Sequence, residues 1–340
     1  MALIVEKFGG SSLANIDKLR NAASIVAADY KKENQLVVVV SAQGDSTDHL
    51  VEQAEAIGRR ISPREMDVLL STGEQASMAL MAMMLMSMGV PAVSLCGWQA
   101  GIRTDALHSK ARIEYIDTRR ICAELAQDRV VVVAGFQGIS PSGDITTIGR
   151  GGSDTTAVAL AAALEADVCR IYTDVDGVYS ADPRVVQNAV RHYEIDYDEM
   201  LELASQGAQV LHNRSVEMAK RFGVQLEVKS SFINGVGTRV REVVMEKRSV
   251  SGVARDQNVA LVTLEGLQDQ PGNMWRLFSG LTEQKMNVDI ILQPPAVGQQ
   301  TSITFSVPRE SLDHAVEMLT EHRGDLMYEG ISVDDRVCKI

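Results

Sequence analysis

The chain reads TIGRGGSD at residues 147–154, and an uncharged, alanine-rich run follows from Thr155 to Leu164. Three glycines in four positions would weaken the interior of a helix or a strand, so the stretch predicts a loop that leads into a helix. Ser153 or Asp154 is the natural N-cap residue of that helix. The N–H groups of a helix start and the planar guanidinium of Arg150 favour a bound phosphate or carboxylate. An ordinary glycine-rich turn is the alternative that this stretch leaves open.

A second glycine turn follows the first predicted strand. The apolar run from Ala2 to Val5 predicts that strand, KFGGSS follows at residues 7–12, and a helical pattern runs from Asn15 to Lys32. This order of strand, glycine turn and helix also suits a phosphate. The chain contains neither the P-loop motif GxxxxGK[ST] nor the dinucleotide motif GxGxxG, and here Lys7 leads the turn. A surface lysine beside a tight turn is the alternative.

Buried strands alternate with helices along most of the chain. Continuous apolar runs predict strands covered on both faces, at residues 36–40, 90–95 and 130–134, and two further strands are predicted at residues 169–172 and 224–230. Helical patterns lie between them, at residues 48–57, 197–206 and 213–222 and in a methionine-rich segment that ends at Met88. The alternation predicts an α/β fold, a three-layer αβα sandwich around a mainly parallel sheet.

The pattern of predicted strands and helices changes near Val250. Strands are predicted at residues 259–266, 287–293, 301–307 and 328–333, and helices at residues 273–285 and 309–322. The order β-α-β-β-α-β is that of a ferredoxin-like unit, which hosts many functions and identifies none of them alone. Residues 336–340 look like the start of one more strand.

Three polar features stand near the ends of predicted elements. The loop SAQGDST at residues 41–47 follows a buried strand, where ligands of open α/β sheets collect. Glu74 is the first charge at the edge of the methionine-rich helix, where it either complements the helix dipole or binds an ammonium group. The segment TDVDGVYSADPR at residues 173–184 has groups typical of calcium or magnesium ligands, but its spacing does not fit an EF-hand.

Composition disfavours several classes of protein. The 340 residues exceed one typical core, so two domains are expected. A net charge of −12 without a basic stripe disfavours nucleic acid as a partner. The four cysteines form no CxxC pair, and no signal peptide is visible, which favours a cytoplasmic protein. Residues 76–95 form an uncharged stretch that is long enough to cross a bilayer, but Gly89 and Pro91 interrupt it. A buried helix followed by a strand is therefore expected there in place of a membrane span.

Three segments together are more specific than each alone. KFGGSS at residues 7–12, GRGGSD at residues 149–154 and the segment 173–184 resemble the signature segments of the aspartokinases, within the amino-acid kinase family. The resemblance runs from Ala2 to about Val333, and the second domain resembles an ACT domain. It implies a catalytic domain at residues 1–245, an ACT-like regulatory domain at residues 250–335 and the start of a second ACT unit at residues 336–340, so that the chain is either a truncated form or naturally short.

The resemblance implies ATP-dependent phosphorylation of the β-carboxylate of L-aspartate to 4-phospho-L-aspartate, on the way to lysine, threonine and methionine. Magnesium would come with ATP, without a direct protein ligand. Lys7 would stabilise the transferred phosphoryl group and Asp154 would orient Lys7, while Arg150 would bind the α-carboxylate and Glu74 the α-ammonium of aspartate. The other implied contacts are Ser41, Thr47, Gly151 and Ser153 for aspartate, and, with Lys7, Phe8, Gly9, Gly10, Ser11, Thr173, Asp174, Tyr179, Asp182 and Arg184 for ATP.

The same resemblance implies an effector site for lysine or threonine, formed by Asp269, Met274, Asn287, Val288, Asp289 and Gln293. A helix-entry turn at Asp269 is the alternative, and the bulky pair Met274-Trp275 would narrow such a pocket. ACT units commonly pair between chains, so a homodimer or a higher homo-oligomer is expected. Two departures from the family stand out: Gln209 replaces a usual lysine, which would weaken ATP binding, and Asn213 replaces a usual proline.

Two other functions stay open. One is a sister kinase of the same fold that acts on glutamate, N-acetylglutamate or a nucleotide, although Glu74 and Arg150 disfavour a nucleotide acceptor. The other is a catalytically silent amino-acid sensor, which the intact Lys7, Arg150 and Asp154 disfavour. The missing dinucleotide motif disfavours a dehydrogenase.

Overall fold

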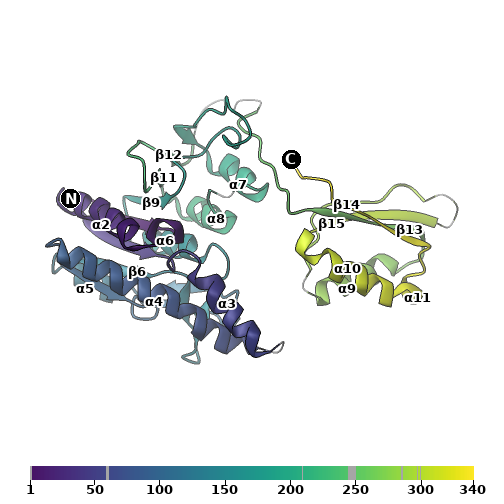
Figure 1. Cartoon of the computed structure of the whole chain (residues 1–340), viewed down its shortest axis with the longest axis horizontal. Helices are drawn as coiled ribbons and strands as arrows, with labels where there is room; N and C mark the ends of the chain where they lie inside the picture. The colour runs from purple at the N-terminus through teal and green to yellow at the C-terminus, as the bar shows by residue number, and fades with distance from the viewer. Residues whose placement is uncertain are drawn as a thin grey trace. The chain divides into compact units, whose positions relative to one another are not determined.

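The computed structural model describes residues 2–58, 61–208, 210–243, 250–284, 286–296, 298 and 300–340. The chain divides into two compact units, Met1–Val253 and Ala254–Ile340 (Figure 1). The predicted boundary between residues 245 and 250 falls on a segment that lies largely outside the described residues.

The first unit is built around an eight-stranded sheet in the order β10-β12-β11-β9-β1-β2-β6-β3. All neighbouring pairs are parallel except β11 with β12, which confirms the predicted mainly parallel sheet. The strands are β1 (Leu3–Phe8), β2 (Gln35–Val40), β3 (Ala92–Leu95), β6 (Val130–Ala134), β9 (Val168–Thr173), β10 (Glu194–Ile195), β11 (Leu226–Ser230) and β12 (Thr238–Val240).

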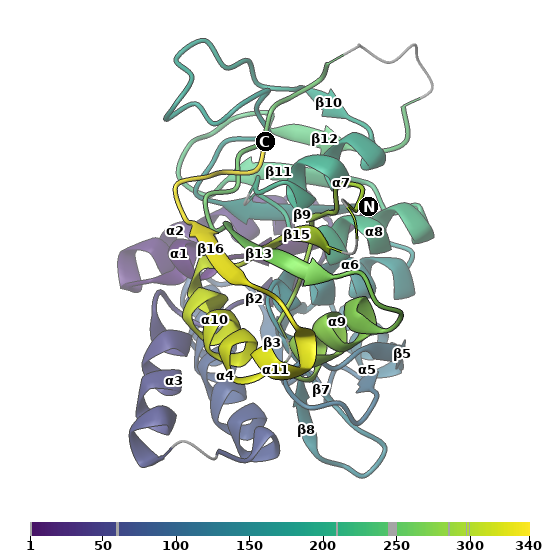
Figure 2. The ribbon, with the colours of Figure 1, turned by 90° about the vertical axis from the view of Figure 1, so that its right-hand side faces the viewer.

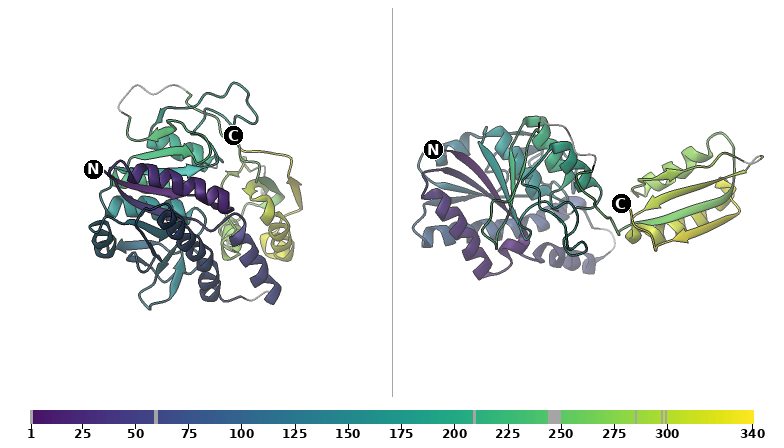
Figure 3. Two further views of the ribbon diagram at one scale, coloured as in Figure 1. Left: turned by 60° about the vertical axis from the view of Figure 1, so that its left-hand side comes forward. Right: turned by 90° about the horizontal axis from the view of Figure 1, so that it is seen from above.

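Helices cover both faces of this sheet, as the view in Figure 2 shows and as Figure 3 shows from above. One face carries α2 (Ile16–Tyr30) and α4 (Pro63–Ser87), and α3 (Ser46–Ile57) packs against α4. The other face carries α5 (Arg119–Leu125), α6 (Gly152–Ala163), α7 (Tyr197–Ser205) and α8 (Asn213–Phe222). The three-layer sandwich is therefore confirmed.

The sequence did not predict α5, the short strands β10 and β12, or a second small sheet in this unit. That sheet has the order β5-β4-β7-β8 and consists of β4 (Ile102–Thr104), β5 (Ile113–Ile116), β7 (Gln137–Ile139) and β8 (Ile145–Thr147). Strands of three or four residues give too short a pattern for alternation to be recognised. Their position matters, because β8 leads directly into the glycine loop at residues 149–152.

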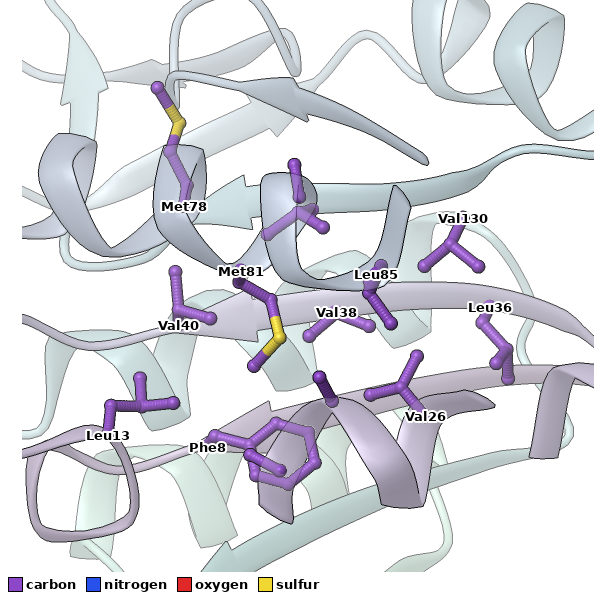
Figure 4. Close-up of a cluster of buried hydrophobic side chains, with 14 of the residues drawn as sticks. Phe8, Leu13, Val26, Leu36, Val38, Val40, Met78, Met81, Leu85 and Val130 are labelled. Atoms are coloured by element: carbon purple, nitrogen blue, oxygen red, sulfur yellow. The ribbon is translucent and has the colours of Figure 1, made fainter. Parts of the chain in front are cut away.

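The helix α4 differs from the prediction, which placed Glu74 at the start of a methionine-rich helix. It is one helix of 25 residues, and by length and composition it could cross a bilayer. It packs instead on β2, β3 and β6 and buries Met78, Met81 and Leu85 in the core (Figure 4). Other methionines of the run, Met83 and Met86, are exposed, so only part of the run fills the core.

Side chains of β1 point alternately to the two faces of the sheet. Phe8 lies in the core on the α2 side (Figure 4). Its ring is stacked on that of Tyr172, with ring centroids 4.7 Å apart. On that same side Arg170 binds Asp29 at 2.7 Å and lies 3.4 Å from Glu6, and burial raises the pKa of Glu6 to about 8. Lys7 therefore points to the opposite face, towards α6.

The second unit is an antiparallel sheet in the order β14-β15-β13-β16 with helices on one face (Figure 1). Its elements follow the predicted order β-α-β-β-α-β and confirm the ferredoxin-like unit. They are β13 (Ala260–Gln268), α9 (Asn273–Glu283), β14 (Ile291–Leu292), β15 (Gln300–Val307), a 3₁₀ turn (Arg309–Ser311), α10 (Leu312–Glu321), α11 (Arg323–Leu326) and β16 (Gly330–Asp334).

Two details of this unit differ from the expectations. The predicted strand at residues 287–293 is reduced to β14, and the predicted end of the preceding helix, Lys285, lies outside the described residues. Near the C-terminal end Lys339 forms an antiparallel bridge with Asp256 of the same unit. That residues 336–340 begin a further ACT unit stays a prediction.

Candidate active site

The carboxyl ends of β1, β2, β6 and β9 meet at one edge of the large sheet. Backbone hydrogen bonds join them there: Gly9 N–H donates to the Tyr172 carbonyl at 3.3 Å, and Ser41 N–H donates to the Phe8 carbonyl at 3.1 Å. Gly135 N–H donates to the Val40 carbonyl at 3.0 Å. The first glycine turn and the hydroxyl-rich loop are therefore neighbours at the edge where open α/β sheets bind ligands.

A buried ion pair lies at this edge. Lys7 Nζ, near the end of β1, is 2.6 Å from Asp154 Oδ1 in the first turn of α6, and their side chains are only 11% and 13% exposed. The structure thus brings together the two residues that the resemblance implies to be catalytic. Asp154 fixes the position of the ammonium group and supplies its counter-charge.

The helix α6 starts differently from the prediction. Its N-cap is Gly151, in the left-handed region at φ +67°, and neither Ser153 nor Asp154 caps it. A Cβ at Gly151 would lie 2.2 Å from His212 Cγ, so glycine is required for space as well as for backbone angle. Ser153 and Asp154 instead lie in the first helical turn, where Asp154 can reach Lys7.

Arg150 stands between two glycines that both have positive φ. Gly149 has φ +85° and Gly151 has φ +67°, so this part of the loop bends sharply. The Arg150 side chain is exposed, and within the described part of the chain its guanidinium has no ion-pair partner. It is therefore available for an anionic ligand.

Glu74 lies in the middle of α4, not at a helix start as predicted. It is buried, and its Oε1 accepts a hydrogen bond of 3.1 Å from Ala42 N–H in the loop after β2. Its Oε2 is buried without a hydrogen-bond partner among the residues that the structure describes. Burial raises the pKa of Glu74 to about 7. An orphaned carboxylate oxygen of this kind suits a ligand that donates hydrogen bonds and carries positive charge.

The remaining residues predicted for aspartate lie at the same edge. Ser41 follows β2 directly, and Thr47 is in the first turn of α3. Ser153 is buried against Gly135, where a Cβ would come within 2.8 Å of its Oγ. The role of these hydroxyl groups in binding aspartate stays a prediction.

Half of the residues predicted for ATP lie at the end of β1 and in the first glycine turn, and the other half lie at the end of β9 and in the segment that follows it. Thr173 Oγ1 donates to Asp174 at 3.0 Å, and Tyr179 hydroxyl donates to Asp176 at 2.9 Å. Gly10 opens the single turn of α1 (Gly10–Leu13), on which Ser11 is exposed. The single turn of α1 separates this glycine turn from the long helix predicted behind it, α2, whereas α6 starts directly at its own glycine loop and offers its helix dipole to the site.

The structure bears on two expectations for this region. The Phe8 ring is fully buried on the α2 side of the sheet, so only the backbone of Phe8 is placed to contact a nucleotide, and its role for ATP stays a prediction. The acidic groups of the segment 173–184 do not converge as metal ligands do, because Asp176 pairs with Arg191 and Asp182 with Arg184. Throughout the described ranges, no three His, Cys, Asp or Glu side chains are placed to share a metal ion.

The predicted effector residues lie in the second unit. Asp269, Asn287, Asp289 and Gln293 are exposed, and Met274 and Val288 pack on the core of the unit. Asp289 forms an ion pair of 2.5 Å with Lys339. The turn after Asp269 is a helix entry, with Gly272 at φ +95° as the N-cap of α9. This geometry agrees with the alternative that Asp269 belongs to a helix-entry turn, and the effector role stays a prediction.

Sequence reasoning missed two charged residues next to the glycine loop, Asp67 and Arg214. Asp67 is fully buried in α4 and Arg214 lies in the first turn of α8. The first could have been noticed, because Asp67 and Glu74 are seven residues apart and therefore share one face of a helix. Gln209 lies outside the described residues, and Asn213 is the first residue of α8, a position that proline also suits.

Comparison with known proteins identifies the family of this chain. The family model of the amino acid kinase family matches residues 2–230. Aspartokinase 2 of Bacillus subtilis is 48% identical over 342 aligned residues, which cover 100% of this chain and 84% of the relative. The aspartokinase of Geobacillus stearothermophilus is 50% identical over 332 residues, 97% of this chain and 82% of the relative.

The chain belongs to the aspartokinase family. Its structure agrees with that of Escherichia coli aspartokinase III solved in complex with aspartate and ADP, with a TM-score of 0.80, 27% identity and coverage of 98% of this chain and 85% of that one. The same enzyme in complex with lysine and aspartate gives a TM-score of 0.80 at 28% identity. The match spans both units, so the ferredoxin-like unit is part of this aspartokinase fold.

Replacement of Gly151 tests the glycine loop. We expect Gly151→Ala to destabilise this aspartokinase by about 1–3 kcal/mol more than Gly143→Ala, because overpacking against His212 adds to the backbone strain. Gly143 is a matched control, since it also has positive φ, +88°, but a Cβ there would meet nothing within 4 Å. The measurement is the free energy of unfolding in denaturant. Equal losses in the two variants would contradict the tight packing at Gly151.

Proposed function

We propose that the aspartate kinase activity of this chain proceeds at the Lys7–Asp154 edge by direct transfer of the γ-phosphoryl group of ATP. An oxygen of the aspartate β-carboxylate forms a bond to the γ-phosphorus, and the bond from that phosphorus to the bridging oxygen of ADP breaks. The nucleophile is ionised at neutral pH, so no general base is needed. The products are ADP and 4-phospho-L-aspartate.

Lys7 supplies the charge that this transfer needs. Negative charge shifts towards the leaving oxygen and the transferred group, and a fixed ammonium group stabilises it there. Its ion pair with Asp154, at 2.6 Å, is the single observation that supports this role most directly. A lysine held by a buried partner does not have to be reoriented when the reaction occurs.

Aspartate is recognised through its α-carboxylate and α-ammonium groups. Among the residues that the structure describes, the guanidinium of Arg150 has no ion-pair partner and suits the α-carboxylate, and Glu74 Oε2 has no hydrogen-bond partner and suits the α-ammonium. The hydroxyl groups of Ser41, Thr47 and Ser153 and the backbone of Gly151 complete the proposed contacts. A nucleotide or phosphate acceptor would leave Glu74 without a cationic partner.

ATP is held by the first glycine turn and by the segment after β9. Gly9, Gly10 and Ser11 would contact its phosphates, and the proposed contacts after β9 are Thr173, Asp174, Tyr179, Asp182 and Arg184. The carboxylates of that segment are engaged by neighbouring side chains, which fits magnesium that is held mainly by the phosphates. Magnesium bound with ATP would neutralise part of the negative charge of the phosphates.

The second unit is proposed to be an ACT-like sensor of lysine or threonine, through Asp269, Met274, Asn287, Val288, Asp289 and Gln293. The support is its ferredoxin-like fold and the likeness to the lysine complex of the E. coli enzyme. Pairing of such units into a homo-oligomer is part of the same proposal. A cytoplasmic location fits the four free cysteines.

A hydroxamate assay tests the reaction. Hydroxylamine traps an acyl phosphate, so we expect signal with ATP, magnesium and L-aspartate, and none with L-glutamate or N-acetylglutamate. Addition of lysine or threonine tests the sensor role in the same experiment. Signal with another acceptor would indicate a sister kinase, and folded protein that binds lysine without any turnover would indicate a silent sensor.

The titration of Glu74 gives a second test. The unliganded carboxyl group is protonated below its pKa of about 7, and only its ionised form attracts the α-ammonium. The KM for aspartate should therefore fall about tenfold from pH 6 to pH 8, while the KM for ATP changes little. Glu74→Gln should raise the KM for aspartate and remove this pH dependence. An unchanged pH profile in the variant would show that Glu74 does not bind the ammonium.

A further inference from the structure

Two charged side chains hold the loop that carries Arg150. The first is Asp67, whose fully buried carboxylate accepts hydrogen bonds from Thr147 N–H at 3.1 Å and from Thr147 Oγ1 at 2.6 Å. The same carboxylate accepts from Ser109 N–H at 3.0 Å and contacts His108 Nδ1 at 2.9 Å. One side chain of α4 thus joins the end of β8 to the segment at residues 108–109.

The second is Arg214, at the start of α8. Its guanidinium donates to the Ile148 carbonyl at 2.9 Å and to the Ala111 carbonyl at 3.0 Å. Arg214 therefore joins the same two segments as Asp67 does, at Ile148 in place of Thr147 and at Ala111 in place of Ser109. A backbone bond of 2.9 Å from Ala111 N–H to the Thr147 carbonyl lies between the two side-chain contacts.

These contacts come from opposite faces of the large sheet. The helix α4 packs on the side of β2 and β6 that faces α2, whereas α8 packs on α6 (Figure 2). Residues 147–148 are thus fixed from both sides, and Arg150 follows after one glycine. Gly149 also leaves little room, because a Cβ there would lie 3.0 Å from the Ser109 carbonyl oxygen.

Arg150 itself has no such support. Its side chain is exposed, and no acidic side chain in the described ranges pairs with it. The direction of its guanidinium therefore depends on the backbone that precedes it. A misplacement of about 1 Å in a substrate-binding group can reduce activity by about a hundredfold.

We propose that Asp67 and Arg214 are positioning residues that hold the Arg150 loop in the geometry that binds the α-carboxylate of the amino-acid substrate. Neither residue touches the substrate. The inference rests on the proposed function, since it assigns the loop to aspartate and not to ATP. It predicts that loss of either residue affects aspartate far more than ATP.

The test is steady-state kinetics of Asp67→Asn, with both substrates varied. The amide keeps the size of the carboxylate but turns a donor towards the N–H groups of Ser109 or Thr147, which also donate. We expect the KM for aspartate to rise at least tenfold and the KM for ATP to change less than threefold. A residue with a purely structural role would reduce the fraction of active enzyme, so kcat would fall while both KM values stayed the same.

Glu124→Gln is the matched control. Glu124 is also a buried carboxylate with ion pairs, to Arg120 and Arg129, but it lies in α5 and takes no part in the proposed site. We expect this variant to keep both KM values even if it is less stable. If Asp67→Asn behaves as Glu124→Gln does, or raises both KM values equally, the inference is wrong.

Arg214→Lys provides an independent test if Asp67→Asn does not fold. A single ammonium group cannot bond both carbonyls as the guanidinium fork does, so the same selective rise in the KM for aspartate is expected. Unchanged aspartate KM in Arg214→Lys would overturn the role of Arg214. If the wild-type chain shows no turnover, the proposed function fails, and titration calorimetry of aspartate binding to wild type and variants still decides the inference.

Discussion

The ion pair between Lys7 and Asp154 is the interaction on which the site depends. It joins the end of β1 to the first turn of α6, so the two glycine turns of the sequence meet across one contact of 2.6 Å. Both side chains are almost completely buried, where an unpaired charge would be strongly unfavourable. The pair therefore fixes the ammonium group in place before a substrate arrives.

The fold supplies this contact through two constraints. Phe8 and Glu6 turn towards α2, so Lys7 must turn towards α6. Gly151 lets α6 begin one residue before Ser153, which places Asp154 within reach. Glu74 lies in α4, bonded to the loop after β2, and Arg150 lies in the loop before α6. The site thus draws on three elements that are distant in sequence.

Much of this arrangement could be predicted from the sequence. Apolar runs predicted β1, β2, β3 and β6 at the centre and one side of the large sheet, but not the short outer strands β10 and β12, and the glycine turns marked the edge where Lys7 and Asp154 meet. The resemblance to aspartokinases supplied the roles of the residues, which kinetics has still to test. The N-cap of α6 could not be predicted, because the choice of Gly151 depends on His212, which is distant in sequence. The mid-helix position of Glu74 was missed because polar residues interrupt the apolar pattern of α4.

A double-mutant cycle on the ion pair tests the central claim most directly. We expect Lys7→Met to lower kcat at least a thousandfold and Asp154→Asn to lower it less, with the KM values for both substrates less affected. If Asp154 acts by holding Lys7, the double variant should be no slower than Lys7→Met alone. Multiplication of the two losses would mean that the residues act independently, and an effect of Lys7→Met on KM alone would contradict its role in phosphoryl transfer.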